Sequence, residues 1–267
     1  NRIPTGTNYD TTICENSTLD IDPQDHTDVA SSTFTWSGDN GSSGTGVIDD
    51  SPTNATNSQI DVVYTVIPTG PTGCTGSEFY VTVHVDPETE TGTLAYGAGQ
   101  DEICLGNDVD LSLSGQVGDI ERYRWYLDGT YENGQNSSSA TYTHTPDEGG
   151  TWRYQARVQS GVCPEQWGNN VEVIVNPTTV GGSVAPNSNI CSGQTSGELT
   201  LSGHVGDVEN WEYQYAPFSG SFGAWTDIVH TGTIYTSGAL NNPGTYRFRA
   251  VVRSGECNPQ NSGYATV

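Results

Sequence analysis

The chain has 267 residues and is strongly acidic, with 32 Asp and Glu residues against 8 Arg, no Lys and a formal net charge of −24. This charge argues against nucleic acid or an anionic membrane surface as a partner, and no apolar run is long enough to span a bilayer. The absence of Lys also excludes Schiff-base chemistry and Lys–Asn isopeptide crosslinks.

The apolar residues, 33% of the chain, are mostly Val, Ile, Tyr and Trp in short alternating runs. Such runs bury one face of a sheet, and turn residues come after them every 8–15 positions, which is typical of β-sandwiches. No stretch resembles an amphipathic helix of three turns. The sequence therefore predicts an all-β fold, and the length suggests two or three domains.

The first third of the chain is a distant copy of the other two thirds. Strand-like runs are expected around Ile13-Cys14, in 17–22, at Phe34–Trp36, in 62–66 and in 79–85. Pro87 comes directly after the last of these runs, where a proline ends a strand and stiffens a linker.

The second and third parts of the chain match each other closely. Residues 111–121 align with 199–209, and residues 151–164 align with 245–257. Each copy begins with Ile-Cys-x-Gly, and Pro177 ends the second copy as Pro87 ends the first. Two blocks in the same order about 90 residues apart indicate a repeat. We predict three domains, 1–87, 88–177 and 178–267.

An aromatic residue comes after the first cysteine of each repeat at a similar distance. Trp36 and Trp125 lie 22 and 21 residues after that cysteine, and Tyr213 lies 22 residues after it. We expect these side chains on the third strand, packed in the core. The aligned tryptophan of the third repeat, Trp211, is displaced to the position of Tyr123.

The six cysteines predict disulfides and an oxidising compartment, because they are evenly distributed and none forms a C-x-x-C pair or a zinc-ligand spacing. Two per repeat favours the pairs Cys14–Cys74, Cys104–Cys163 and Cys191–Cys257. In a standard sandwich, however, these loops could lie at opposite ends, roughly 25–30 Å apart. The alternative is a bridge between neighbouring domains, such as Cys14 with Cys163, which leaves the end cysteines to pair with domains outside this sequence.

The pattern of Ile-Cys-x-Gly, Leu-x-Leu-Ser-Gly-x-Val-Gly and a final Ser-Gly-x-Cys resembles the Ig-like repeats of giant surface proteins of Bacteroidota. The Gly73-Cys74-x-Gly76 segment with its next strand and Pro87 resembles the PKD-like domains found beside them. The resemblance implies three tandem Ig-like/PKD-like sandwiches in an extended rod. It also implies export by the type IX secretion route, a cell-surface location and a role like that of the adhesins of gliding motility.

Catalytic motifs are missing from the sequence. It has no G-x-S-x-G, H-E-x-x-H or phosphate-binding loop, and its five His residues are scattered, so we expect no enzyme activity.

Acidic clusters in the first repeat could hold a structural Ca²⁺, although neither fits a known calcium loop and a solvated acidic face is the simpler explanation. These clusters contain Asp20, Asp22, Asp25, Asp28, Asp49 and Asp50.

An aromatic, Gly-rich segment in the third repeat is the best candidate for a ligand contact. Phe218, Phe222 and Trp225 could stack on sugar rings or enter a partner protein, or Trp225 could instead be buried beside Ile228. Trp167 is expected to cover one end of a core. Thr11 lies in an Asp-Thr-Thr sequence that resembles the O-glycan acceptor motif of Bacteroidota.

Arg residues alternate along the repeated strands, at positions 153 and 157 and at 247, 249 and 253, and are expected to form cross-strand ion pairs.

These features favour a non-enzymatic structural or adhesive segment of an extracellular stalk, with neighbouring repeats as its main partners. Two alternatives stay open. The third domain could bind a carbohydrate or protein through its aromatic loop, or the segment could assemble into a filament in which another chain completes the strand at 264–267.

Overall fold

The computed structural model describes residues 2–128, 130–131 and 138–267. The described residues form strands and one short 3-10 helix, Pro23–His26, and none of their helices is long and apolar enough to cross a membrane. The predicted all-β fold of tandem Ig-like sandwiches is confirmed. The chain forms two compact units, and the division falls within the middle repeat. Unit 1 contains residues 1–95, 111–142 and 153–171, and unit 2 contains residues 96–110, 143–152 and 172–267.

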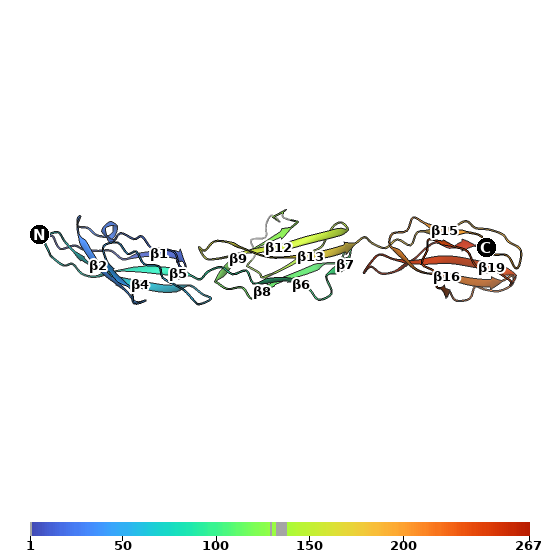
Figure 1. Ribbon diagram of the computed structural model, residues 1–267, viewed down its shortest axis with the longest axis horizontal. Helices are drawn as coiled ribbons and strands as arrows, with labels where there is room; N and C mark the ends of the chain where they lie inside the picture. The colour runs from blue at the N-terminus through green and yellow to red at the C-terminus, as the bar shows by residue number, and fades with distance from the viewer. Residues whose placement is uncertain (1, 129, 132–137) are drawn as a thin grey trace. The chain divides into compact units, whose positions relative to one another are not determined.

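The first repeat, in unit 1, is built on a five-stranded sheet in the order β1-β5-β4-β2-β3 (Figure 1). β1 runs parallel to β5, and the other neighbours are antiparallel. The strands are β1 Tyr9–Cys14, β2 Thr33–Gly38, β3 Ser43–Thr45, β4 Ile60–Thr69 and β5 Phe79–Asp86.

Alternation of side chains decides which face of this sheet is buried. In β5, Val81, Val83 and Val85 are fully buried, and the residues between them are more exposed, as a period of two requires. A second layer closes the core, where Ile21 and Ile48 exchange backbone hydrogen bonds of 3.2 and 2.9 Å. Trp36 is 6% exposed, so its predicted place in the core is confirmed.

The middle repeat has two sheets, of five and three strands, in the orders β10-β9-β12-β13-β7 and β11-β8-β6. Trp125, on β9, is 1% exposed and lies in the core as predicted. The strands are β6 Thr93–Tyr96, β7 Glu102–Cys104, β8 Val109–Ser114, β9 Ile120–Leu127, β10 Thr130–Tyr131, β11 Thr141–His144, β12 Gly150–Ser160 and β13 Gln166–Asn176.

The third repeat, in unit 2, likewise combines a three-stranded and a five-stranded sheet. Its orders are β14-β15-β18 and β17-β16-β19-β20, and β21 also pairs with β19. The strands are β14 Ser183–Ala185, β15 Leu199–Ser202, β16 Asp207–Pro217, β17 Thr226–Ile228, β18 Ile234–Tyr235, β19 Gly244–Arg253, β20 Gln260–Asn261 and β21 Ala265–Thr266.

The sequence alignment of Trp211 with Tyr123 is wrong. Trp211 lies opposite Ala250, as Trp125 lies opposite Ala156, so the two tryptophans are equivalent. Trp211 comes two residues after the aligned block 199–209, whereas Trp125 comes four residues after the block 111–121. The pairing of the strands, not the sequence spacing, therefore shows which residues are equivalent. Trp211 is fully buried and donates a 2.8 Å hydrogen bond from Nε1 to the carbonyl of Gly232. Tyr213 is half-buried and packs against the edge of this core.

Candidate functional site

The first disulfide joins two consecutive repeats. Cys14, the last residue of β1, is bonded to Cys163, which lies in the turn between β12 and β13, with a Cα–Cα distance of 4.7 Å. Both residues belong to unit 1, although 149 positions separate them in the sequence.

The second disulfide repeats this arrangement in unit 2. Cys104, the last residue of β7, is bonded to Cys257, which lies in the turn after β19, again with a Cα–Cα distance of 4.7 Å. In each case the first cysteine of one repeat is joined to the second cysteine of the next.

The favoured pairs, Cys14–Cys74, Cys104–Cys163 and Cys191–Cys257, are therefore wrong, and the alternative bridge between neighbouring repeats is confirmed. Cys14 pairs in register with Asp86 at the end of β5, whereas Cys74 precedes the start of β5. The length of this strand, roughly 25 Å, separates the two cysteines within one sandwich. A disulfide needs Cα atoms within about 7 Å, so it can form only with the adjoining repeat.

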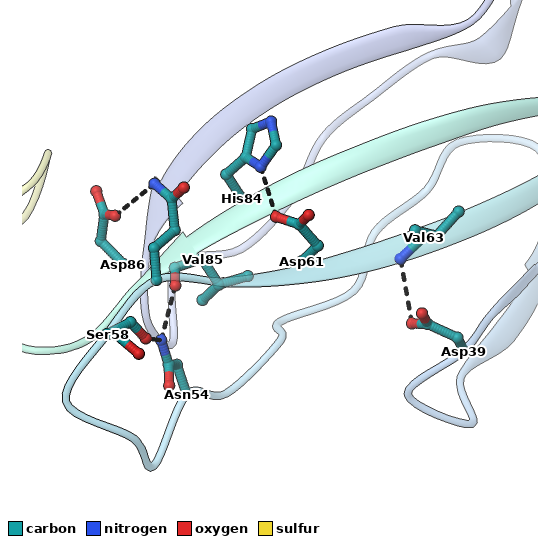
Figure 2. Close-up of polar contacts among 9 residues, drawn as sticks. Asp39, Asn54, Ser58, Asp61, Val63, His84, Val85 and Asp86 are labelled. Carbon is teal, nitrogen blue, oxygen red and sulfur yellow. Dashed lines mark hydrogen bonds and ion pairs between the residues drawn. The ribbon is translucent and has the colours of Figure 1, made fainter.

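The first joint is the contact between the end of β5 with its linker, residues 86–90, and the turn that carries Cys163; the second joint is the equivalent contact of residues 176–180 with the turn of Cys257. Asp86 holds the first joint through both of its carboxylate oxygens. It is 3% exposed and lies at the end of β5, where Figure 2 shows its side chain beside the strand. One oxygen accepts a 2.8 Å hydrogen bond from Gln59 Nε2, and the other accepts a 2.8 Å bond from the backbone N–H of Val162 in the cysteine turn. A buried carboxylate is tolerated here because donors from both repeats satisfy it.

The loop beside Asp86 is held by a second buried polar side chain. Asn54, 1% exposed, donates from Nδ2 to the carbonyls of Val85 at 2.7 Å and Ser58 at 2.9 Å, as Figure 2 shows. These bonds fix the end of β5 from which the linker to the middle repeat departs.

Each linker makes the same hydrogen bond to the turn that carries the bridging cysteine. The backbone N–H of Ser160 donates to Thr89 Oγ1 at 3.1 Å, and that of Ser254 donates to Thr179 Oγ1, also at 3.1 Å. All four residues are buried. The linkers share the sequence Asp/Asn-Pro-x-Thr, so the sequence contains a signal for this bond whose meaning only the structure shows.

A glycine is required in each cysteine turn. Gly161 and Gly255 have φ angles of +45° and +44°. An added Cβ would lie 2.0 Å from Asp86 Oδ2 at the first joint and 2.1 Å from Asn176 Nδ2 at the second. Only glycine combines this left-handed backbone with so close an approach.

The repeated Val-Gly-Asp motif also binds the linker. Glu90 and Val117 exchange two backbone hydrogen bonds of 3.0 and 3.2 Å, and Val180 and Val205 exchange bonds of 3.2 and 2.9 Å. The Val-Gly-Asp motif that marks the repeat in the sequence is therefore also a part of the contact between repeats.

Two cysteines among the described residues are unbridged. Cys191 is exposed, and Cys74 is half-buried in the turn between β4 and β5. The structure thus places four of the six predicted disulfide cysteines in bridges.

Two of the acidic residues proposed for Ca²⁺, Asp22 and Asp28, have separate partners. Asp22 caps the 3-10 helix by accepting from the Gln24 N–H at 2.9 Å, and Asp28 pairs with Arg2 at 2.8 Å. Asp20, Asp25 and Asp49 are exposed. Across residues 2–128, 130–131 and 138–267, no group of three or more His, Cys, Asp or Glu side chains is arranged to hold a metal ion.

Asp50 is the most strongly hydrogen-bonded of these carboxylates. It accepts from Asn40, Ser42 and Tyr64 side chains at 2.7 Å each and from the Ser51 N–H at 2.8 Å. Burial raises the pKa of Asp50, but these four bonds outweigh it and lower the pKa to about 2. Burial and the neighbouring Asp50 raise the pKa of Tyr64, so the phenol stays a donor.

The aromatic loop of the third repeat does not present three free rings. The Arg247 guanidinium lies 3.9 Å from the ring centre of Phe222, and that of Arg249 lies 3.9 Å from the ring centre of Trp225. Both rings are half-buried, while Phe218 is 84% exposed. Trp225 therefore packs against an Arg side chain rather than entering the core.

The prediction of ion pairs is confirmed for three of the five repeated Arg residues, whereas Arg247 lies over the rings of Phe222 and Tyr264. Arg249 contacts Glu212 at 2.5 Å, and Arg253 contacts Glu209 at 2.6 Å. In the middle repeat, Arg157 contacts Glu165 at 2.8 Å, two residues beyond the bridging cysteine.

Two other predicted residues lie on strands. Trp167 lies near the start of β13, is 47% exposed and stacks obliquely on Tyr126 at 4.5 Å between ring centres. Thr11 is half-buried within β1, where its backbone lies opposite Val83.

The first and the third repeat match known domain families. Residues 11–89 match the PKD-like domain family, and residues 180–267 match a domain of unknown function (DUF8696). No curated protein matches the chain.

Solved structures that match this chain include domains A168–A170 of titin, which are 14% identical with a TM-score of 0.39, covering 98% of each chain. The eight N-terminal Ig domains of Down Syndrome Cell Adhesion Molecule are 14% identical with a TM-score of 0.47, covering 99% of this chain and 36% of that one. Fibronectin(III)-like modules of Clostridium thermocellum CbhA are 13% identical with a TM-score of 0.30, covering 66% of this chain and 94% of that one.

Proposed function

We propose that this chain is a non-enzymatic structural segment of an extracellular stalk, in which disulfides fasten each sandwich to the next. The observation that carries this proposal is the repetition of one joint. A cysteine at a strand end of one repeat is bridged to the turn cysteine of the next repeat, first at Cys14–Cys163 and again at Cys104–Cys257.

The joint is built to resist relative motion of the repeats. Interfaces between domains of one chain are usually small and permit movement. Here a covalent bond is supplemented by the linker bonds at Thr89 and Thr179. Each bridge also closes a loop of about 150 residues, which in the chain-entropy model stabilises the folded state by up to about 5 kcal/mol.

A location outside the cell fits this chemistry. Disulfides persist in oxidising compartments, and a high net negative charge keeps a long surface protein soluble. The resemblance of the repeats to those of secreted Bacteroidota surface proteins supports a place in a large cell-surface protein of this kind.

The experiment that tests the proposal compares the native chain with a variant in which Cys14, Cys163, Cys104 and Cys257 are all Ser. ¹⁵N NMR relaxation measures the rotational correlation time of each repeat. We expect the repeats of the native chain to tumble together, and those of the variant to tumble independently with shorter correlation times.

The matched control replaces Cys74 and Cys191 with Ser, which leaves both bridges intact, and it should behave like the native chain. Equal correlation times in the native chain and the four-Ser variant would show that the bridges do not stiffen the segment, and the stalk proposal would fail.

A further inference from the structure

The two bridges obey one rule of position. Cys14 and Cys104 each come directly after an Ile and end a strand that runs parallel to the last strand of their own repeat. Cys163 and Cys257 each lie in a Ser-Gly-x-Cys turn of the next repeat. By this rule, the third repeat has a strand-end cysteine and the first repeat has a turn cysteine that are not used within the described residues.

Cys191 occupies the strand-end position. It comes directly after Ile190, and its segment runs beside the last strand of the repeat, because the N–H of Ser188 donates to the carbonyl of Thr266 at 3.0 Å. Asn187 Oδ1 accepts from the Thr266 N–H at 2.7 Å on the same edge. The Cys191 side chain is exposed, so a partner can reach it.

A cavity beside Cys191 is the second observation. Its volume is about 270 Å³, and its lining includes Ile190, Cys191, Leu240, Pro243 and Tyr246. These residues give it an apolar wall next to the exposed thiol.

The corresponding place in the middle repeat is filled by the linker. Gly149 corresponds to Pro243, since each precedes the glycine that begins β12 or β19. A Cβ on Gly149 would lie 3.3 Å from the Val175 carbonyl oxygen and 3.3 Å from Pro177 N. The cavity of the third repeat therefore lies where the middle repeat holds residues of its linker.

Cys74 occupies the turn position. It lies in the turn after β4, the strand that corresponds to β12 and β19, and its carbonyl accepts from the Gly70 N–H at 2.9 Å. The turn is longer than the other two, with Cys74 five residues after the strand ends at Thr69, compared with three from Ser160 to Cys163.

We propose that Cys191 is a crosslinking site for the turn cysteine of another sandwich of this kind, and that Cys74 is the complementary site for a strand-end cysteine. This inference rests on the proposed function and extends it, by assigning a partner to each end of the segment. The two thiols lose two protons and two electrons to a small-molecule disulfide such as oxidised glutathione, which is reduced to two thiols. The partner is a further repeat of the same polypeptide or a second copy of this chain, both of which offer the same chemistry.

The first test uses two single variants, C191S and C74S, in a glutathione redox buffer. In each variant one unbridged thiol remains without its complementary cysteine, so each variant alone should form only the small amount of dimer that undirected thiol pairing gives. An equimolar mixture should form at least about tenfold more disulfide-linked dimer than either variant alone, because docking raises the effective concentration of the two thiols. Non-reducing gel electrophoresis measures the dimer.

The second test maps disulfides in the protein isolated from its native source. Cleavage after Glu places each cysteine on its own peptide, with Cys74 on 16–78 and Cys191 on 173–198. Peptide 173–198 linked to 16–78 identifies a second copy as the partner, and its linkage to a Ser-Gly-x-Cys peptide from outside this sequence identifies a further repeat.

The inference is overturned if Cys191 is a free thiol in the native protein and the mixture forms no more dimer than the separate variants. The same digest separates this failure from that of the proposed function. Loss of the Cys14–Cys163 and Cys104–Cys257 links would contradict the stalk itself, whereas their presence with a free Cys191 would contradict only the crosslinking site.

Discussion

Gly161 approaches Asp86 so closely that a Cβ added to the glycine would lie 2.0 Å from the carboxylate oxygen Oδ2. That oxygen accepts the Val162 N–H at 2.8 Å, one residue before the bridging cysteine. The carboxylate at the end of one repeat thus accepts a hydrogen bond from the turn of the next repeat. This contact is possible only because Gly161 has no side chain. At the second joint, Gly255 approaches Asn176 in the same way.

Replacing Gly161 with Ala should weaken the first joint. The substitution places a Cβ against Asp86 and imposes a left-handed φ on a residue that disfavours it, so we expect a loss of at least about 2 kcal/mol. Gly115→Ala is the matched control, because Gly115 has a φ of +74° but nothing within 4 Å of its Cβ position. Urea unfolding measures the free energy of unfolding of both variants. Equal losses in Gly161→Ala and Gly115→Ala would show that the contact with Asp86 is unimportant.

Removal of the first bridge should destabilise the chain without unfolding its sandwiches. The double variant C14S/C163S avoids mispaired thiols, and we expect it to lose about 2–5 kcal/mol with little change in the far-UV circular dichroism spectrum. Limited proteolysis should also become faster in the linker around residues 87–90. Unchanged unfolding and cleavage in this variant would argue against a structural role for the bridge.

Asp50 should make the first repeat sensitive to acid. Its pKa in the folded state, about 2, lies below the ordinary value of 3.8, so the stabilisation is complete above about pH 4 and is lost as the pH falls toward 2. Urea midpoints measured from pH 5 to pH 2 should fall more steeply for the native chain than for Asp50→Asn. Tyr64→Phe removes one donor and should give an intermediate slope, whereas parallel curves would refute this role of Asp50.

Two tryptophans of the third repeat should respond differently to truncation. Trp211 is fully buried, so Trp211→Ala should cost about 3–5 kcal/mol. Trp225 packs its face on Arg249 at the surface, so Trp225→Ala should cost about 1 kcal/mol or less. Thermal unfolding measures the loss of stability in each of these two variants. A loss in Trp225→Ala as large as that in Trp211→Ala would show that the Trp225 ring lies in the core.

The fold class could be predicted from the sequence because period-two alternation is a local signal and the 90-residue repeat is visible when the sequence is compared with itself. The core positions of Trp36 and Trp125 were predicted from their spacing after the first cysteine, but the same spacing chose Tyr213 in the third repeat, where Trp211 fills the core. Trp211 was misaligned because it comes two residues after the aligned block, where Trp125 comes four residues after it, and only pairing with Ala250 reveals the register.

The disulfide pairing could not be chosen by counting cysteines. It depends on which end of a sandwich each cysteine occupies, and this is set by the parallel pairing of β1 with β5, which places Cys14 beside Asp86. The Asp/Asn-Pro-x-Thr linkers and the Ser-Gly-x-Cys turns were visible in the sequence. Their contact joins residues more than 70 positions apart, so no local pattern could reveal it.

The most direct test of the account is a disulfide map of this chain under non-reducing conditions, after cleavage at Glu. We predict that peptide 1–15 is linked to 149–165 and that peptide 103–121 is linked to 257–267. Linkage of 1–15 to 16–78, or of 103–121 to 149–165, would place the bridges within single repeats and contradict a stalk fastened from one sandwich to the next.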